Sequence, residues 1–133
     1  MKKFLIFIFF TLFSKNLFAN EFTLNCNMDS YSNTTNVNVA KSWVNPNSKF
    51  TVNGSEATYH YSNRTLSGSA QDKGDKLKMY FSRTVTMKSG TRTQKVKANL
   101  IIDYFYSNNK IAADWKFVGF QDLGTVWGKC SKD

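Results

Sequence analysis

The residue types that most often carry out catalysis are sparse in this chain of 133 residues. His60 is the only histidine, and the alternation around it places it on the outer face of a strand, away from any base or nucleophile. Asp72 and Asp75 flank the dipeptide Lys73-Gly74, but two carboxylates are too few for calcium and a lysine stands between them. No nucleophile-elbow motif is present. We therefore expect no enzyme activity, no metal site and no cofactor.

Positive charge gathers in one short segment, which carries no aspartate or glutamate between positions 83 and 97. Closely spaced cations bind polyanions because binding releases condensed counterions, and anionic lipid head groups attract such segments as well. The alternative is a solvated hairpin whose lysines only keep a sheet edge from aggregating. The hypothesis of an anion-binding site rests on Arg83, Lys88, Arg92, Lys95 and Lys97.

Two further sites remain open as alternatives. The inward side of the predicted sheet carries aromatic side chains with a polar tip, which in a small barrel could line a cavity for an apolar ligand. Those residues are Tyr59, Tyr61, Tyr104 and Trp115. The outward side carries an apolar patch, which indicates either a protein partner or a covering segment such as residues 29–47. Its members are Ile101, Phe105, Val118, Phe120 and Trp127.

The amino terminus has the composition of a secretory signal peptide. Lys2 and Lys3 precede an apolar run that ends before Ala19, where we expect cleavage. Residues 1–19 are thus a predicted signal peptide, and residues 20–133 one secreted β domain located in the periplasm or outside the cell. The formal net charge of the whole chain is +9. Nucleic acid is not an expected partner in that compartment, and the oligomeric state stays open.

Cys26 and Cys130 are the only cysteines, and they stand near the two ends of the predicted domain. Disulfides form in oxidising compartments, so we expect these two residues to be joined. Their Cα atoms must then lie within about 7 Å, which brings the first and last strands side by side.

From Ser48 onward, apolar and polar residues alternate with period two, and short turn signals separate the runs. The fold class predicted is all-β: an antiparallel up-and-down meander of eight or nine strands closed as a small barrel, with a β-sandwich as the alternative. The turns are expected at Asn53-Gly54, Asn63-Arg64, Lys73-Gly74, Ser89-Gly90 and Asn108-Asn109.

These turns imply specific cross-strand neighbours. Phe50 is expected opposite Ala57, and a four-residue loop before Thr125 would place Trp115 opposite Cys130. The neighbouring strands are expected to stop near Ser82 and Lys97. This leaves a two-stranded ribbon of roughly 20 Å projecting from the body.

The function expected from these observations is that of an exported, non-enzymatic binding protein. Its ribbon, residues 83–97, would contact an anionic lipid or polysaccharide surface. One alternative is a lipocalin-like carrier of a small apolar ligand in the barrel interior. The other is a protein inhibitor or partner-binding module that uses the outer aromatic patch.

Overall fold

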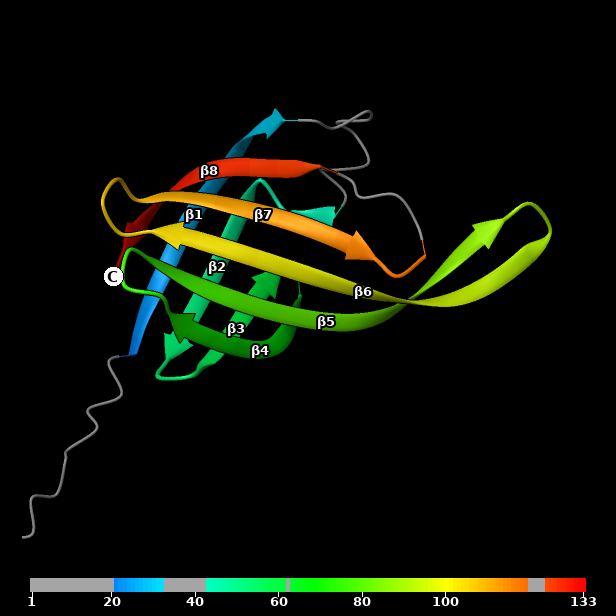
Figure 1. The fold of residues 1–133 in the computed structure, drawn as a ribbon, viewed down its shortest axis with the longest axis horizontal. Helices are drawn as coiled ribbons and strands as arrows, with labels where there is room; N and C mark the ends of the chain where they lie inside the picture. The colour runs from blue at the N-terminus through cyan, green and yellow to red at the C-terminus, as the bar shows by residue number, and fades with distance from the viewer. Residues whose placement is uncertain (1–20, 33–42, 62, 120–123) are drawn as a thin grey trace, which may run out of the picture.

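The fold is that of a computed structural model, which describes residues 21–32, 43–61, 63–119 and 124–133. The signal peptide predicted for residues 1–19 lies outside the described residues. In the described parts, eight strands each pair antiparallel with the next, and the last returns to the first (Figure 1). The strands are β1 (Glu21–Ser32), β2 (Asn47–Asn53), β3 (Glu56–Tyr61), β4 (Arg64–Asp72), β5 (Lys76–Ser89), β6 (Arg92–Phe105), β7 (Lys110–Phe117) and β8 (Thr125–Lys132). The predicted meander barrel is confirmed, and the sandwich alternative is wrong.

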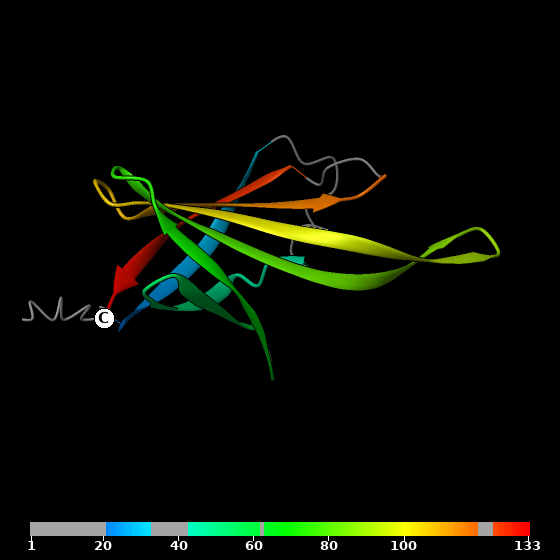
Figure 2. The ribbon, with the colours of Figure 1, turned by 60° about the horizontal axis from the view of Figure 1, so that its bottom comes forward.

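The alternation in sequence becomes the two faces of the barrel wall. In β6, every second side chain from Val96 to Tyr104 is buried, while the residues between them are exposed or half-buried. The same pattern in the other strands fills the barrel with apolar side chains, among them Leu24, Phe50, Met79, Phe81, Leu100, Ile102 and Ile111. Figure 2 shows the strands of the barrel wall from a second direction.

The disulfide closes the barrel. Cys26 and Cys130 are direct partners in the β1–β8 ladder, with their Cα atoms 4.0 Å apart. The prediction that the bond joins the first and last strands is therefore confirmed. A disulfide of this kind is consistent with an oxidising environment outside the cytoplasm.

All five predicted turns are wrong by one residue. Those predicted at 53–54, 73–74 and 89–90 lie one residue too early, and those predicted at 63–64 and 108–109 lie one residue too late. Gly54 and Gly90 occupy the first position of two-residue turns, with φ of 60° and 62°. A glycine at that position is typical of a type II′ turn, whereas the sequence pattern suggested type I′. Phe50 consequently lies opposite Tyr59 instead of Ala57. The slip changes each partner by two residues, so every side chain keeps its predicted face.

The predicted contact between Trp115 and Cys130 is wrong. Trp115 pairs with Leu100, and the backbone N–H of Cys130 donates to the carbonyl of Asn109 at 2.9 Å. The β7–β8 ladder already ends at Asp114 and Thr125. The connection between the two strands is therefore longer than the four residues predicted for it.

Trp43 closes one end of the barrel instead of covering the outer patch. Its ring packs edge-on against Trp115 and Phe117, with centroids 5.6 and 4.9 Å away. The indole N–H of Trp115 donates to the Trp43 carbonyl at 2.8 Å. Val44, the next residue, is buried in the core. Trp43 and Val44 belong to the segment 29–47 that was considered as a cover for the outer patch, and for these two residues that expectation is wrong.

Candidate functional site

The hairpin of β5 and β6 extends well beyond its neighbours. The β4–β5 ladder ends at Gly68 and Phe81, and the β6–β7 ladder ends at Ala98 and Phe117. Beyond these points the two strands pair, among the described residues, only with each other, apart from one hydrogen bond from the Val118 N–H to the Lys97 carbonyl. Figure 1 shows this hairpin extending away from the barrel. Residues 82–97, here called the arm, form the two-stranded ribbon that the sequence predicts.

The outward face of the arm carries a row of lysines. On this face Lys97 pairs with Thr84, Lys95 with Thr86, and Lys88 with Thr93. Lys116 of β7 was not among the predicted site residues. It pairs with Asn99, which is two residues along β6 from Lys97, so Lys116 and Lys97 are diagonal neighbours on the same face. All four lysines of this row, Lys88, Lys95, Lys97 and Lys116, are exposed.

The spacing of this row favours joint action on one anionic partner. Successive residues on one strand face are about 7 Å apart, and diagonal neighbours are about 7–8 Å apart. These separations are below the Debye length of roughly 8 Å at physiological salt or close to it. The electrostatic fields of neighbouring lysines in this row therefore overlap.

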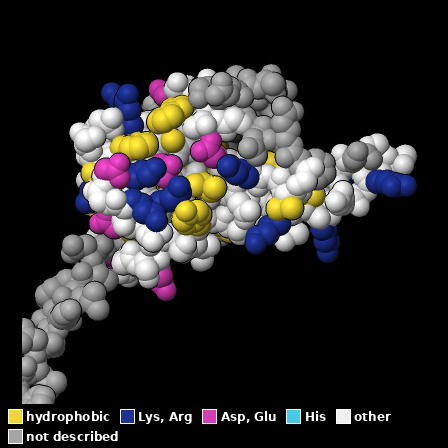
Figure 3. Space-filling view, in the orientation of Figure 1, with side chains coloured by type: hydrophobic (Ala, Val, Ile, Leu, Met, Phe, Trp, Pro, Cys, Tyr) yellow, Lys and Arg dark blue, Asp and Glu magenta, His cyan; other side chains and the backbone are white. Residues whose placement is uncertain are grey.

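No carboxylate neutralises the arm from within, since its sequence contains none. Among the described residues, ion pairs join Lys76 and Lys78 to Asp103 on the barrel body, at 3.6 and 3.8 Å. Figure 3 shows Lys and Arg side chains along the arm, while Asp and Glu gather over the barrel. Among the residues that the structure describes, the arm cations thus form no ion pair.

The inward face of the arm is apolar near the barrel. Val96 is buried, and Val85 and Met87 are half-buried against the core. Arg92 also belongs to this face by register, but it pairs with Ser89 beside the turn and is exposed. The arm therefore joins an apolar base to a cationic tip and outer face.

Arg83 stands apart from the other cations in the predicted site. Its guanidinium carbon lies 4.9 Å from the Trp43 ring, 5.3 Å from that of Trp115 and 5.5 Å from that of Tyr61. One terminal N–H donates to the Tyr61 hydroxyl at 3.0 Å, while the buried Nε has no hydrogen-bond partner. The structure thus places Arg83 among aromatic rings at the base of the arm.

The aromatic residues proposed to hold an interior ligand contact other side chains of the protein. Tyr59 stacks on Phe50 with centroids 4.7 Å apart. The Tyr104 hydroxyl donates to the Asn109 side chain at 2.6 Å, and burial raises the pKa of Tyr104. Trp115 is 3% exposed. Two pockets among the described residues are lined mostly by outward-facing residues of the barrel wall.

The outer apolar patch is divided. Phe105 and Trp127 stack with centroids 6.3 Å apart, and the Lys76 ammonium lies 5.7 Å from the Phe105 ring. Val118, 62% exposed, lies beyond the end of β7 near the base of the arm. Ile101 is half-buried on β6. Phe120 lies outside the described residues.

His60, on which a histidine-dependent catalytic site would rest, has a hydrogen-bond partner in the structure. The His60 ring is engaged with the Thr51 hydroxyl at 2.9 Å. No group of three or more His, Cys, Asp or Glu side chains in the described parts of the chain could hold a metal ion. No helix in them is long and apolar enough to span a membrane.

The chemistry that this arrangement offers is electrostatic attraction along an exposed ribbon. Comparisons with family models, with curated proteins and with solved structures found no match.

Proposed function

We propose that this protein is a non-enzymatic binding protein that engages an anionic polymer or surface through its arm. One observation carries the proposal: the arm projects from the barrel, carries exposed cations and contains no carboxylate. The cations assigned to binding are Lys88, Arg92, Lys95 and Lys97, with Lys116 continuing the row.

The packing of the molecule favours this function over the two alternatives. The tyrosines and tryptophan assigned to an interior ligand already pack against neighbouring side chains. The outer patch is split between the Phe105–Trp127 pair and Val118. The arm offers several like charges on one exposed surface, which is the arrangement that polyanion binding requires.

The expected strength follows from the number of charges. Each Lys or Arg near an anionic membrane contributes about 1 kcal/mol, so the four arm cations together contribute about 4 kcal/mol. Every 1.4 kcal/mol is a tenfold change in affinity, so their removal weakens binding by roughly 500- to 1000-fold. Arg83 is not counted because aromatic rings surround it.

The test compares two variants of equal net charge. In the arm variant, Lys88, Arg92, Lys95 and Lys97 all become glutamine. In the control variant, four exposed cations elsewhere on the barrel become glutamine, namely Lys49, Arg64, Lys73 and Lys132. Binding of the mature protein to heparin and to vesicles containing phosphatidylserine is measured across a salt series.

The wild type and the control should bind at low salt, with an affinity that falls steeply as salt rises. The arm variant should bind far more weakly and with a shallower salt dependence. For a flexible polyanion, the slope of log affinity against log salt falls by about 0.7 for each anionic group no longer neutralised, and so by roughly 3 for the four cations. Equal binding by the two variants would show that net charge alone is responsible and would refute the proposal.

A further inference from the structure

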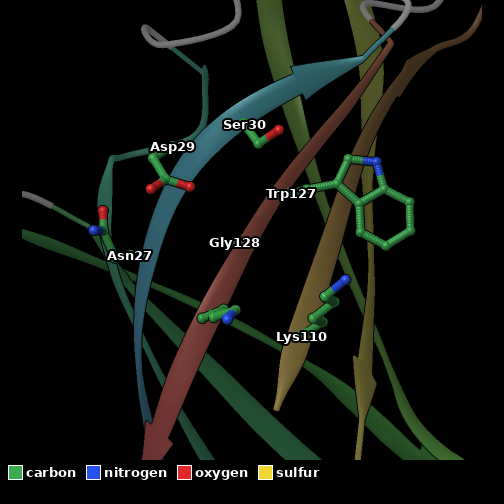
Figure 4. Close-up of a pocket in the computed structure, with 7 residues that line it drawn as sticks. Asn27, Asp29, Ser30, Lys110, Trp127 and Gly128 are labelled. Atoms are coloured by element: carbon green, nitrogen blue, oxygen red, sulfur yellow. The ribbon is translucent and has the colours of Figure 1, made fainter. Parts of the chain in front are cut away.

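A pocket lies on the outer wall of the barrel, at the seam that the disulfide closes. It has a volume of about 500 Å³ and is lined by residues of β1, β7 and β8. Its polar and aromatic lining residues are Asn27, Asp29, Ser30, Lys110, Trp127 and Lys129. Figure 4 shows Ser30 and Lys110 pointing toward the Trp127 ring, with Asn27 and Asp29 on the other side of β1.

A β-bulge shapes this pocket. Met28 pairs with Gly128 and Ser30 with Trp127, so Asp29 is an extra residue in β1. Bulges redirect side chains and bend the strand that carries them. The two strands approach so closely that a Cβ on Gly128 would lie 2.2 Å from the Asn27 carbonyl oxygen. Only glycine permits this approach, and the bulge places the Asp29 carboxylate at the pocket edge.

Two lysines stand side by side in the wall of this pocket. Lys110 and Lys129 are cross-strand partners, and both are exposed. The neighbouring pair, Asn109 and Cys130, carries the ladder hydrogen bond. Lys110 and Lys129 therefore form a non-hydrogen-bonded pair, in which Cα atoms are only about 4.5 Å apart. Like charges in this position destabilise a sheet. An anion bound between the two ammonium groups would relieve that repulsion.

The remaining lining suits a polyhydroxylated ring. Trp127, which stacks on Phe105, supplies an aromatic wall of the pocket, and the negatively charged π-face of such a ring attracts C–H groups. Asn27, Asp29 and Ser30 supply hydrogen-bond donors and acceptors for hydroxyl groups. We propose that this pocket binds a sugar unit carrying a negative charge, such as a uronic acid, with its anionic group between Lys110 and Lys129.

This site is independent of the arm. β6 runs from the arm at Arg92 to Phe105, and Lys110 follows it after a short turn. The pocket therefore lies toward the end of the barrel opposite the arm. Its lining contains none of the arm cations, so either site can fail its test while the other passes.

The experiment is an NMR titration of the mature, disulfide-bonded protein, labelled with ¹⁵N. The probes are glucuronate, glucose and inorganic phosphate. The variants are Lys110→Gln/Lys129→Gln, Trp127→Leu and, as a matched control, Lys73→Gln at the exposed β4–β5 turn. The four-residue arm variant is titrated as well, to separate the two sites. Thermal unfolding of each unliganded protein is recorded alongside.

Glucuronate should give saturable shifts at residues around the pocket and should bind more tightly than glucose or phosphate. The double lysine variant should bind it about tenfold more weakly, since each exposed ion pair contributes up to about 1 kcal/mol. Trp127→Leu should also weaken binding, while the Lys73 and arm variants should match the wild type. Removing one lysine alone, Lys129→Gln, should raise the melting temperature of the free protein, because it ends the repulsion.

Three results would overturn the proposal. Phosphate binding as tightly as glucuronate would show a site for anions without a sugar component. Glucose binding equally well would remove the role of the lysine pair. Absence of saturable shifts with all three probes would show that the pocket does not bind this class of ligand.

Discussion

Replacing Arg83 tests whether this residue anchors the arm or belongs to its anion-binding surface. A cation–π contact at a partly exposed site contributes about 0.5–1 kcal/mol, so the rings of Trp43, Tyr61 and Trp115 together contribute about 2 kcal/mol. The hydrogen bond to the Tyr61 hydroxyl adds about 1 kcal/mol. Arg83→Ala should therefore lower the free energy of unfolding by about 3 kcal/mol, which is roughly 10–15 °C in melting temperature.

Arg83→Met should cost about half as much. Methionine keeps an unbranched side chain of similar length, and its sulfur makes favourable contacts with aromatic rings. It also removes Nε, which is buried without a hydrogen-bond partner. Burying such a donor is unfavourable, so its removal offsets part of the missing cation–π attraction.

Urea unfolding, followed by circular dichroism, measures these changes. A double-mutant cycle that combines Arg83→Met with Tyr61→Phe isolates the hydrogen bond and should give a coupling free energy of about 1 kcal/mol. If Arg83 instead belongs to the anion-binding surface, Arg83→Ala would leave stability within about 0.5 kcal/mol of wild type. It would also weaken heparin binding as much as Lys88→Gln does. That combination would refute the anchoring role.

Two further predictions concern the scaffold. Replacing both Cys26 and Cys130 by serine opens a loop with a sequence separation of 104. Urea titrations should then show a free energy of unfolding that is lower by about 4–5 kcal/mol. A decrease below about 1 kcal/mol would contradict the chain-entropy account. Burial raises the pKa of Tyr104 above its value of 10.0 in the unfolded chain, so its contribution to stability is complete below pH 10 and is lost as pH rises through the folded-state pKa. At pH 8, Tyr104→Phe should be about 1 kcal/mol less stable than the wild type, because the variant lacks the hydrogen bond to Asn109. It should also lose less stability than the wild type above pH 10, as thermal unfolding at both pH values would show, and an equal loss would contradict this assignment.

The barrel could be predicted from sequence because period-two alternation fixes faces. The hairpin registers could not be fixed in the same way. A slip of two residues moves Phe50 from Ala57 to Tyr59 and leaves every side chain on its face, so the hydrophobic pattern cannot distinguish the two. What decides is the turn, in which Gly54 takes the first position instead of the second. The bulge at Asp29 moves the inward position from Met28 to Tyr31, an odd residue after a run of even ones. A single aromatic residue after this shift was too little to predict the bulge or the pocket beside it.

The candidate anion-binding site could be predicted only in part, because charge shows which residues are cations but not which face of the ribbon each one occupies. Charge alone assigned Arg83 and Lys88 to one set, since both are cations on the same strand. Their positions differ by an odd number, so they lie on opposite faces of the ribbon. Trp43, which lies over the Arg83 guanidinium, comes from a segment that the sequence could not place. A contact between such distant parts of the chain follows from barrel closure and not from local pattern.

Strand parity also separates the cations that hold the fold from those that can bind a partner. On β5 the odd-numbered residues face the core, and Arg83 is the one cation among them. Lys88, Lys95 and Lys97 face outward, and Arg92 faces inward only beyond the last core contact, beside the turn. These four can therefore be neutralised without disturbing the packing of the barrel. Stability and anion binding should respond to different residues of one hairpin, which makes the two roles separable by experiment.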